Sequence, residues 1–417
     1  MAEVKPDIET FAKIKVVGIG GSGGNGINRM ADANIKGVEY VAINTDAQAL
    51  HQSLASEKVH IGKNLTKGLG AGMNPEVGRQ AAEENRDEIQ DVLKGADMVF
   101  VTCGLGGGTG SGASPIVAET AKEIGALTVG VVTKPFTFEG AQRRAIAMEA
   151  LESLKDRVDA LITIPNDKLL SIIDKKTTLI NAFRIVDDVL RQGVQGISDL
   201  ITKPGIVNVD FADVRAILEN SGSALMGIGI ASGENRAAQA AKAAINSPLL
   251  ELSIDGAKGV LFNVTGSSDM TMLEINEAAN IITEAIDPNA KVIFGAVMDD
   301  QVRKGELQIT VVATGFDTDR VQDRRFGFVQ SVTTPKQEEP IKESVSQNTT
   351  PTMQEKKQEQ PPEKIIYPQK RTSPIESKFI TEEKVQKRPG FTKSSLEDDG
   401  VEEDFEIPAF IRRKIKK

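Results

Sequence analysis

Two glycine-rich segments have the residue types and the spacing to bind phosphate groups. The segments GIGGSGGN at 18–25 and GLGGGTGSG at 104–112 each follow a short apolar run and precede a helical pattern. Glycine lets the backbone approach a phosphate closely, and the first turn of a following helix presents unpaired N–H groups. Six glycines in nine residues at 104–112 would destabilise a regular element by about 1 kcal/mol each, which favours a loop whose backbone contacts a ligand. For 18–25, a purely structural tight turn is the alternative.

Two classes of nucleotide-binding protein are consistent with these loops. Gly18, Gly20 and Gly23 satisfy the pattern GxGxxG, and Glu39 lies about where a Rossmann fold places its ribose-binding acid, which favours a dinucleotide oxidoreductase. That class predicts a single glycine fingerprint and a separate catalytic His or Lys. The second loop argues against it, and neither His has a plausible catalytic partner. Neither loop ends in the Lys-Ser/Thr of a Walker A motif, so together they predict a polyphosphate site outside the P-loop class.

Composition excludes several other classes of protein. The 417 residues carry a net charge of −9, only 4 % aromatic residues and no Trp, which argues against a nucleic-acid partner. The single Cys103 and the two His exclude a disulfide framework and Cys- or His-rich centres, and no metal site is predicted. The N-terminus lacks a signal-peptide pattern, and no apolar run approaches the ~20 residues of a membrane helix. We therefore expect a cytoplasmic protein without a transmembrane segment.

The elements that position these loops alternate along the first 316 residues. Continuous apolar runs predict strands buried on both faces, and the helical patterns between them predict a mainly parallel sheet. A long helix follows, and then a second set of strands and helices predicts a smaller mixed α/β domain. The expected strands are at 14–20, 40–45, 98–103, 127–132, 160–164, 224–230, 259–265, 291–298 and 307–313, and the expected helices at 75–94, 139–156, 179–202, 234–246 and 271–286.

The composition changes abruptly near Gly315. Residues 1–316 hold 35 of the 38 Gly but 8 of the 17 Pro, and the rest of the chain is rich in Lys, Glu, Gln, Pro and Ser. Such a segment buries too little apolar surface to offset the entropy of ordering it. The expected division is a nucleotide-binding domain at 1–178, a central helix at 179–202, a second domain at 203–316, a disordered linker at 317–403 and a short peptide at 404–417.

Several motifs together resemble one family. The segment GGGTGSG at 106–112 matches the tubulin signature, and it is joined by the segments NTD at 44–46, GLGAGMNP at 68–75, PFTFEG at 135–140 and NVDFAD at 208–213. Residues 12–316 resemble the FtsZ family, the bacterial tubulin-like cell-division GTPases. The resemblance implies a tubulin-like α/β fold in which 203–316 is an activation domain carrying the catalytic loop. It also implies GTP or GDP as ligand, with Mg²⁺ held mainly by the nucleotide phosphates.

The resemblance also implies roles for individual residues. The two glycine loops wrap the phosphates, the Gly70–Met73 loop senses the γ-phosphate, and Glu139 and Arg143 lie at the ribose and phosphates. Asn25 and Asp187 read guanine, with Phe183 against the ring. Ser22 stands where many relatives have Gly. The implied nucleotide-binding residues are Gly21, Ser22, Gly23, Gly24, Asn25, Gly72, Gly108, Thr109, Gly110, Glu139, Arg143, Phe183 and Asp187.

The chemistry of Asp187 agrees with guanine recognition. A carboxylate accepts hydrogen bonds from both N1–H and N2–H of guanine, whereas adenine offers an acceptor at N1 and no 2-amino group. Sites of this kind discriminate by up to ~10⁴–10⁵-fold. Phe183 and Asp187 are four residues apart, and therefore on one helix face. The alternatives are a solvated helix acid at Asp187 and an ordinary i,i+4 surface pair for Glu139 and Arg143.

Asn208, Asp210 and Asp213 are the candidates for orienting a hydrolytic water. For Asp210, N-capping of the next helix is the alternative.

On the expected long helix, Asp187 and Thr202 are 15 residues apart, or about 22 Å at 1.5 Å per residue. Asp210 therefore acts only on the nucleotide of another subunit, and a head-to-tail contact that does not close a ring builds a filament. Tubulin-like proteins assemble in this way, so the resemblance implies a GTPase completed by polymerisation. A nucleotide-binding scaffold without hydrolysis is a further alternative, disfavoured by the intact acids.

The C-terminal peptide predicts a second kind of partner. An acidic run at 396–404 precedes Phe405–Lys417, which carries five cations, and Ile407, Phe410, Ile411 and Ile415 follow helical spacing. An apolar cluster beyond a long linker is typical of a docking peptide, and a solvated tail is the alternative. The segment resembles the FtsZ C-terminal peptide, which implies binding to membrane anchors and division regulators. The implied location is a ring at midcell, on the inner face of the cytoplasmic membrane.

Overall fold

The computed structural model describes residues 12–170, 177–203, 205–247, 250, 253–299 and 302–316. All of them lie in one unit of the chain, Met1–Thr333. The predicted linker at 317–403 and the predicted peptide at 404–417 lie outside the described residues. Within the described ranges, none of the helices combines the length and the apolar composition that a membrane span requires.

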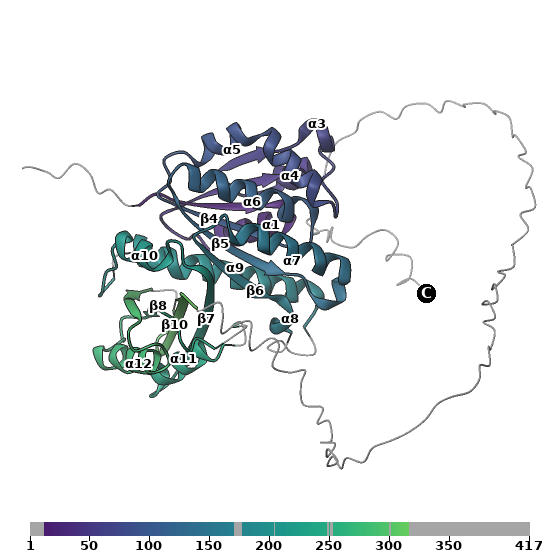
Figure 1. Ribbon diagram of the computed structural model, residues 1–417. Helices are drawn as coiled ribbons and strands as arrows, with labels where there is room; N and C mark the ends of the chain where they lie inside the picture. The colour runs from purple at the N-terminus through teal and green to yellow at the C-terminus, as the bar shows by residue number, and fades with distance from the viewer. Residues whose placement is uncertain are drawn as a thin grey trace, which may run out of the picture. The chain divides into compact units, whose positions relative to one another are not determined.

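The first half of the chain forms the predicted parallel sheet, of which Figure 1 labels β4, β5 and β6. The strand order of this sheet is β3-β2-β1-β4-β5-β6. Its strands are β1 (Ile14–Ile19), β2 (Val38–Asn44), β3 (Glu57–His60), β4 (Met98–Gly104), β5 (Leu127–Lys134) and β6 (Ala160–Pro165). The helices between them are α1 (Gly20–Asp32), α2 (Ala47–Gln52), α3 (Lys63–Thr66), α4 (Pro75–Glu84), α5 (Arg86–Leu93), α6 (Gly108–Glu123), η1 (Thr137–Glu139), α7 (Ala141–Lys155) and α8 (Asn166–Leu169). This strand order is that of a doubly wound fold, whose ligands bind where the order reverses.

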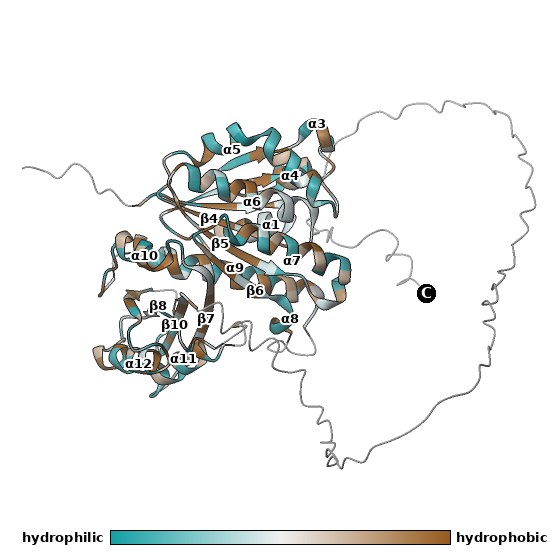
Figure 2. Cartoon of the chain, in the orientation of Figure 1, coloured by the Kyte–Doolittle hydropathy of each residue, from teal (hydrophilic) through white to brown (hydrophobic). Residues whose placement is uncertain are grey.

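The strands of this sheet are apolar along their length, rather than at every second residue, because helices cover both of its faces. In β4, Met98 and Phe100 pack into one hydrophobic cluster, whereas Val99 and Val101 pack into the other. The first cluster includes side chains of α1 and the long helix α9 (Leu179–Thr202), and the second includes side chains of α4, α5, α6 and α7. Figure 2 shows hydrophobic residues concentrated along the strands between these helices. Cys103 is buried in the second cluster, as a small apolar residue.

Two predicted helices are wrong in detail, each because of one residue. The predicted helix at 75–94 is broken at Asn85, whose Oδ1 accepts a hydrogen bond from the N–H of Gly62 (2.8 Å). The predicted helix at 139–156 begins only at Ala141, because Gly140 has a φ of 102°, which a helix cannot accommodate. The short strand β3 was not predicted, since its segment EKVH has only one apolar residue.

The second half of the chain forms the predicted smaller mixed domain. It contains α10 (Phe211–Leu218), β7 (Gly222–Ser232), α11 (Arg236–Ile245), β8 (Gly259–Gly266), α12 (Met272–Glu284), β9 (Lys291–Met298) and β10 (Glu306–Thr314). Strand β10 is antiparallel to both β7 and β8, and β8 is parallel to β9. The sequence did not predict that β7 also pairs with β6, which joins all ten strands into one sheet.

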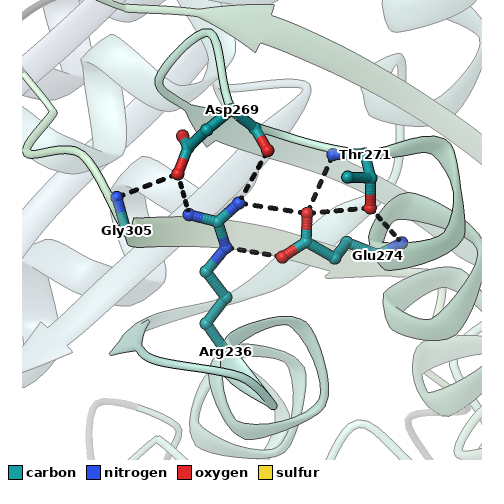
Figure 3. A network of polar contacts seen from close by, with 5 residues as sticks. All are labelled: Arg236, Asp269, Thr271, Glu274 and Gly305. Carbon is teal, nitrogen blue, oxygen red and sulfur yellow. Dashed lines mark hydrogen bonds and ion pairs between the residues drawn. The ribbon is translucent and has the colours of Figure 1, made fainter.

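A buried arginine fastens the helices of this second domain together (Figure 3). Arg236, which begins α11 and is 5 % exposed, donates to both carboxylate oxygens of Glu274 and to the side-chain and main-chain oxygens of Asp269. Asp269 also accepts from the N–H of Gly305, and Glu274 accepts from the N–H of Thr271. Hydrogen bonds from Arg236 lower the pKa of both carboxyls. This network fixes the start of α12 against α11 and the turn before β10.

The helix α9 crosses the sheet from its carboxyl edge to its amino edge. Near its first turn, the Phe183 ring lies edge-on to the ring of Phe136, which follows β5 (centroids 5.6 Å apart). At its last residue, the Thr202 hydroxyl donates to the carbonyl oxygen of Lys36 (3.3 Å), two residues before β2 begins. The two ends of α9 therefore present residues at opposite edges of the sheet.

Candidate active site

A cavity of about 500 Å³ opens at the carboxyl ends of β1 and β4, the neighbouring strands that carry the two glycine loops. Most of the predicted nucleotide-binding residues line it: Gly21, Ser22, Asn25, Gly72, Gly108, Thr109, Gly110, Glu139, Arg143, Phe183 and Asp187. Gly24 instead lines a smaller cavity of about 120 Å³ beside it. Gly23 lines neither cavity and has a packing role, because a Cβ there would lie 2.6 Å from the carbonyl oxygen of Thr102.

The phosphate end of the cavity is built from two helix N-termini. Helix α1 begins at Gly20 and α6 at Gly108, and neither has a side-chain N-cap among the described residues. No side chain therefore competes for the N–H groups in the first turns of these helices, and together with the helix dipoles those groups favour an anion at the cavity edge. Gly72 joins them, since its carbonyl oxygen accepts from the N–H of Gly108 (2.8 Å). This arrangement suits a polyphosphate held by backbone.

The other end of the cavity combines an aromatic ring with a carboxyl group. Phe183 is 40 % exposed and lines the cavity, so part of its ring is available to a planar ligand. One turn further along α9, burial raises the pKa of Asp187 to about 6, an effect that the charge of Asp188 increases and that of Arg29 opposes. Asn25, on α1, lines the same cavity. The predicted base-binding residues therefore lie together, on two neighbouring helices.

Glu139 and Arg143 form the ion pair that the sequence offered as an alternative, and the pair lies at the cavity. Arg143 Nη1 donates to Glu139 Oε2 (2.7 Å), and the other carboxylate oxygen accepts from the N–H of Phe136 (2.9 Å). Both residues line the cavity, and the Glu139 side chain is 16 % exposed. The pair thus presents a fixed carboxylate and a guanidinium between the phosphate end and the aromatic end.

Sequence reasoning missed Asn166, which follows β6. It is 5 % exposed and lines the cavity, and its buried Oδ1 has no hydrogen-bond partner among the described residues. An unpaired buried oxygen is unfavourable until a donor reaches it, so this oxygen is available to an N–H or O–H of a ligand in the cavity. The signal was available, because Asn166 comes two residues after the predicted buried strand at 160–164, at the same edge as both glycine loops.

Glu39 and the acidic loop both lie away from this cavity. Glu39 is near the amino end of β2, where its carboxylate pairs with Lys15 (3.1 Å), so it is not placed as a Rossmann ribose ligand. Asn208, Asp210 and Asp213 are exposed and are absent from the described lining. They follow the far end of α9, and the N–H of Ile206 anchors their loop to the carbonyl oxygen of Ala296 in β9 (2.8 Å).

The acidic loop has local structural roles as well. Asp210 is the N-cap of α10, its Oδ1 accepting from the N–H of Ala212 (3.2 Å), which is the alternative that the sequence offered. Asn208 Oδ1 accepts from the N–H of Gly205 (2.7 Å). Their catalytic role stays a prediction. Among the described residues, no group of three or more His, Cys, Asp or Glu side chains is arranged to hold a metal ion.

Comparisons with known proteins agree with this geometry. Residues 13–174 match the model of the Tubulin/FtsZ family GTPase domain, and residues 222–317 match that of the FtsZ family C-terminal domain. Among solved structures, an empty FtsZ dimer from M. jannaschii is 50 % identical, with a TM-score of 0.71 over 74 % of this chain and 89 % of that chain. A point variant of FtsZ from M. jannaschii is also 50 % identical, with a TM-score of 0.71 over 73 % and 91 %.

A more distant structure shares the fold. A GTPγS-bound protofilament of CetZ2 from Haloferax volcanii is 22 % identical, with a TM-score of 0.62 over 75 % of this chain and 96 % of that chain. The predicted alternative of a dinucleotide oxidoreductase is therefore not supported by any of these matches or by the position of Glu39. Two family models and relatives at half identity cover the nucleotide cavity and the domain that follows it. The chain belongs to the tubulin/FtsZ family of GTPases.

Proposed function

We propose that this GTPase assembles head-to-tail into filaments and hydrolyses GTP at the contact between subunits. The observation that carries the proposal is the position of the nucleotide cavity and of the acidic loop, at opposite ends of α9. One surface of a subunit presents the cavity, and the opposite surface presents Asp210. Two such different surfaces make a heterologous contact, which propagates when its rotation does not close a ring. The solved FtsZ dimer and CetZ2 protofilament are consistent with self-association.

Within the proposed contact, the two subunits divide the chemistry of hydrolysis. The first binds the phosphates through the N-terminal N–H groups of α1 and α6, in a fixed geometry. The second supplies Asn208, Asp210 and Asp213, which orient the attacking water toward the γ-phosphate. Mg²⁺ keeps several waters and binds readily through nucleotide phosphates, and we propose that the phosphates are its main ligands here. Loss of the γ-phosphate then weakens the contact, so hydrolysis drives filament turnover.

The experiment for this proposal is GTP turnover per subunit measured against protein concentration. Isolated subunits bind GTP but lack the acids of a neighbour, so specific activity should be low at first, rise steeply, and reach a plateau once light scattering reports filaments. Electron microscopy of the same samples checks that the scattering comes from filaments. Specific activity that does not change with concentration would contradict hydrolysis at the contact.

Guanine binding should weaken as the pH falls below about 6. Asp187 accepts the guanine N–H groups only as a carboxylate, and its pKa of about 6 makes that form the major one above this pH and the minor one below it. The affinity for GDP should therefore fall by ~10-fold between pH 7 and pH 5. GDP binding to Asp187→Asn, measured at the same pH values, is the control, because this variant keeps every other ionisable group. The same pH dependence in both proteins would exclude Asp187 from base recognition.

In cells, we propose that the filaments form the division ring at midcell, attached to the inner face of the cytoplasmic membrane through Phe405–Lys417. The identity of 50 % with FtsZ, against 22 % with CetZ2, favours this role. The peptide's apolar residues at helical spacing and its five cations suit a groove on a membrane-anchor or division-regulator protein.

Deleting 405–417 should leave GTP turnover and polymerisation nearly unchanged while abolishing rings in cells. The reason is that the sequence predicts a disordered linker at 317–403 between the GTPase and the peptide, and such a linker would transmit no structural change. Turnover of the purified protein is compared with the location of a fluorescent fusion, and a variant with the same residues in scrambled order controls for length and charge. A loss of polymerisation in purified protein would show instead that the peptide belongs to the assembly contact.

A further inference from the structure

A buried pair of hydroxyl groups lies directly behind the phosphate loop. Thr45 Oγ1 is 2.7 Å from Thr109 Oγ1, and Thr45 is fully buried after the end of β2. Thr109, in the first turn of α6, lines the nucleotide cavity, whereas Thr45 is not part of the described lining. Thr45 therefore contacts the nucleotide site only through its neighbour.

A phosphate in the cavity fixes the direction of this hydrogen bond. Each threonine hydroxyl has one proton to donate and also accepts, and the oxygens of an ionised phosphate only accept. When a phosphate oxygen lies against Thr109, the Thr109 proton is donated to it. Thr45 must then donate to Thr109, which makes the Thr109 hydroxyl more polarised and a stronger donor. Without the Thr45 hydroxyl, the Thr109 hydroxyl loses both its orientation and this polarisation.

Thr45 also holds the loop that closes the phosphate end of the cavity. Its carbonyl oxygen accepts from the N–H of Gly70 (3.3 Å). It also lies 3.2 Å from the hydroxyl of Thr66, which shares its proton with the carbonyl oxygen of Gly62 (3.1 Å). Two residues beyond Gly70, the carbonyl oxygen of Gly72 accepts from the N–H of Gly108, next to Thr109. The segment from Thr66 to Gly72 and the start of α6 are thus tied together at two points, and Thr45 is one of them.

We propose that Thr45 is a positioning residue for the nucleotide: its side chain orients the Thr109 hydroxyl toward a phosphate, while its main-chain carbonyl holds the 66–72 segment beside it. The inference rests on the proposed use of this cavity for GTP. It predicts that a buried side chain outside the cavity lining controls affinity for the nucleotide. Thr45→Val removes the hydroxyl and keeps the shape, so GTP affinity should fall by ~3–10-fold. Thr45→Ser should restore affinity close to that of the unchanged protein.

The matched control is Thr120→Val. Thr120 lies on the same helix as Thr109 and is as fully buried as Thr45. Its hydroxyl donates to the carbonyl oxygen of Ile116, and it is not part of the described cavity lining. Thr120→Val should leave GTP affinity unchanged, which would show that the loss in Thr45→Val does not come from removing a buried hydroxyl in general. The unfolding midpoint of the nucleotide-free protein is measured for both variants. Affinity is measured by equilibrium titration of the full chain with GTP, below the concentration at which scattering appears.

A double-substitution cycle tests whether Thr45 acts through Thr109. The protein carrying both Thr45→Val and Thr109→Val should bind GTP no more weakly than Thr109→Val alone. Losses of affinity that simply multiply, or a Thr45→Val protein that binds GTP as the unchanged protein does, would overturn the inference while leaving the proposed function standing. If the unchanged protein binds no GTP, the proposed function fails as well.

Discussion

Replacing Asp210 with alanine should lower GTP turnover by at least ~10²-fold and leave GTP affinity unchanged. Asp210 is exposed, lies beyond the far end of α9, and is not part of the described cavity lining, so its removal does not disturb the nucleotide of its own subunit. Its expected target is the γ-phosphate of the neighbouring subunit. Turnover is measured at a concentration where the unchanged protein is fully assembled, and affinity well below it.

The structure shows that alanine at this position also removes a helix cap, which must be separated from catalysis. Asp210 Oδ1 accepts from the N–H of Ala212, and losing such a cap costs about 1 kcal/mol. Asn caps helices about as well as Asp but has no charge. Asp210→Asn should therefore keep the stability of α10 and still lose turnover. If Asp210→Asn retains full activity while Asp210→Ala loses it, capping is the only role of this residue.

Mixing two inactive variants tests whether Asp210 acts on another subunit. A Cβ at Gly108 would lie 2.8 Å from the carbonyl oxygens of Ala71, Gly72 and Asn74, so Gly108→Ala should displace the phosphate loop and lose nucleotide binding. The same variant keeps an unchanged acidic loop. Mixed with Asp210→Ala, which supplies bound GTP, it should restore part of the turnover. The absence of any recovery, together with turnover that is independent of concentration, would indicate that the loop acts within its own subunit.

The parts of the fold that the sequence predicted well are those set by neighbouring residues. Each glycine loop follows a buried strand and begins a helix, so a local pattern was enough to place Gly21 and Gly108 at one edge of a parallel sheet. The predicted helix of 179–202 matches α9, and that match supports the argument that separates Asp187 from Asp210. Periodicity and stop signals act over a few residues and are readable without tertiary information.

What the sequence did not predict depends on contacts between distant residues. The pairing of β6 with β7 joins Ala160 to Gly222, and the break at Asn85 depends on its contact with Gly62. No local pattern encodes either one. Gly23 was assigned to the phosphates by resemblance, yet its packing against Thr102 follows from the crossing of α1 over the sheet. The family pattern identified a motif correctly, and only the packed structure separated residues that line the cavity from residues that support it.

Replacing Asp187 with alanine should reduce the preference for GTP over ATP by up to ~10³–10⁴-fold. The carboxylate matches the two N–H donors of guanine, whereas the acceptor at N1 of adenine leaves a buried carboxylate without a donor, which is costly. Most of the change in the ratio should come from weaker GTP binding. ATP binding should become slightly stronger, because the buried carboxylate that adenine leaves without a donor is no longer there.

Competition binding of both nucleotides to the same variant measures the ratio directly. Asp188→Ala is the matched control, because Asp188 is the adjacent acid on α9, lies beside Arg29 (3.8 Å) and is absent from the described cavity lining. Asp188→Ala should leave the ratio of GTP affinity to ATP affinity unchanged. The phosphate loops are common to both ligands, so an effect on them would change both affinities together and leave the ratio as it was. An unchanged ratio in Asp187→Ala would therefore assign selectivity to other groups in the cavity, of which Asn25 and Asn166 present the remaining amide donors and acceptors.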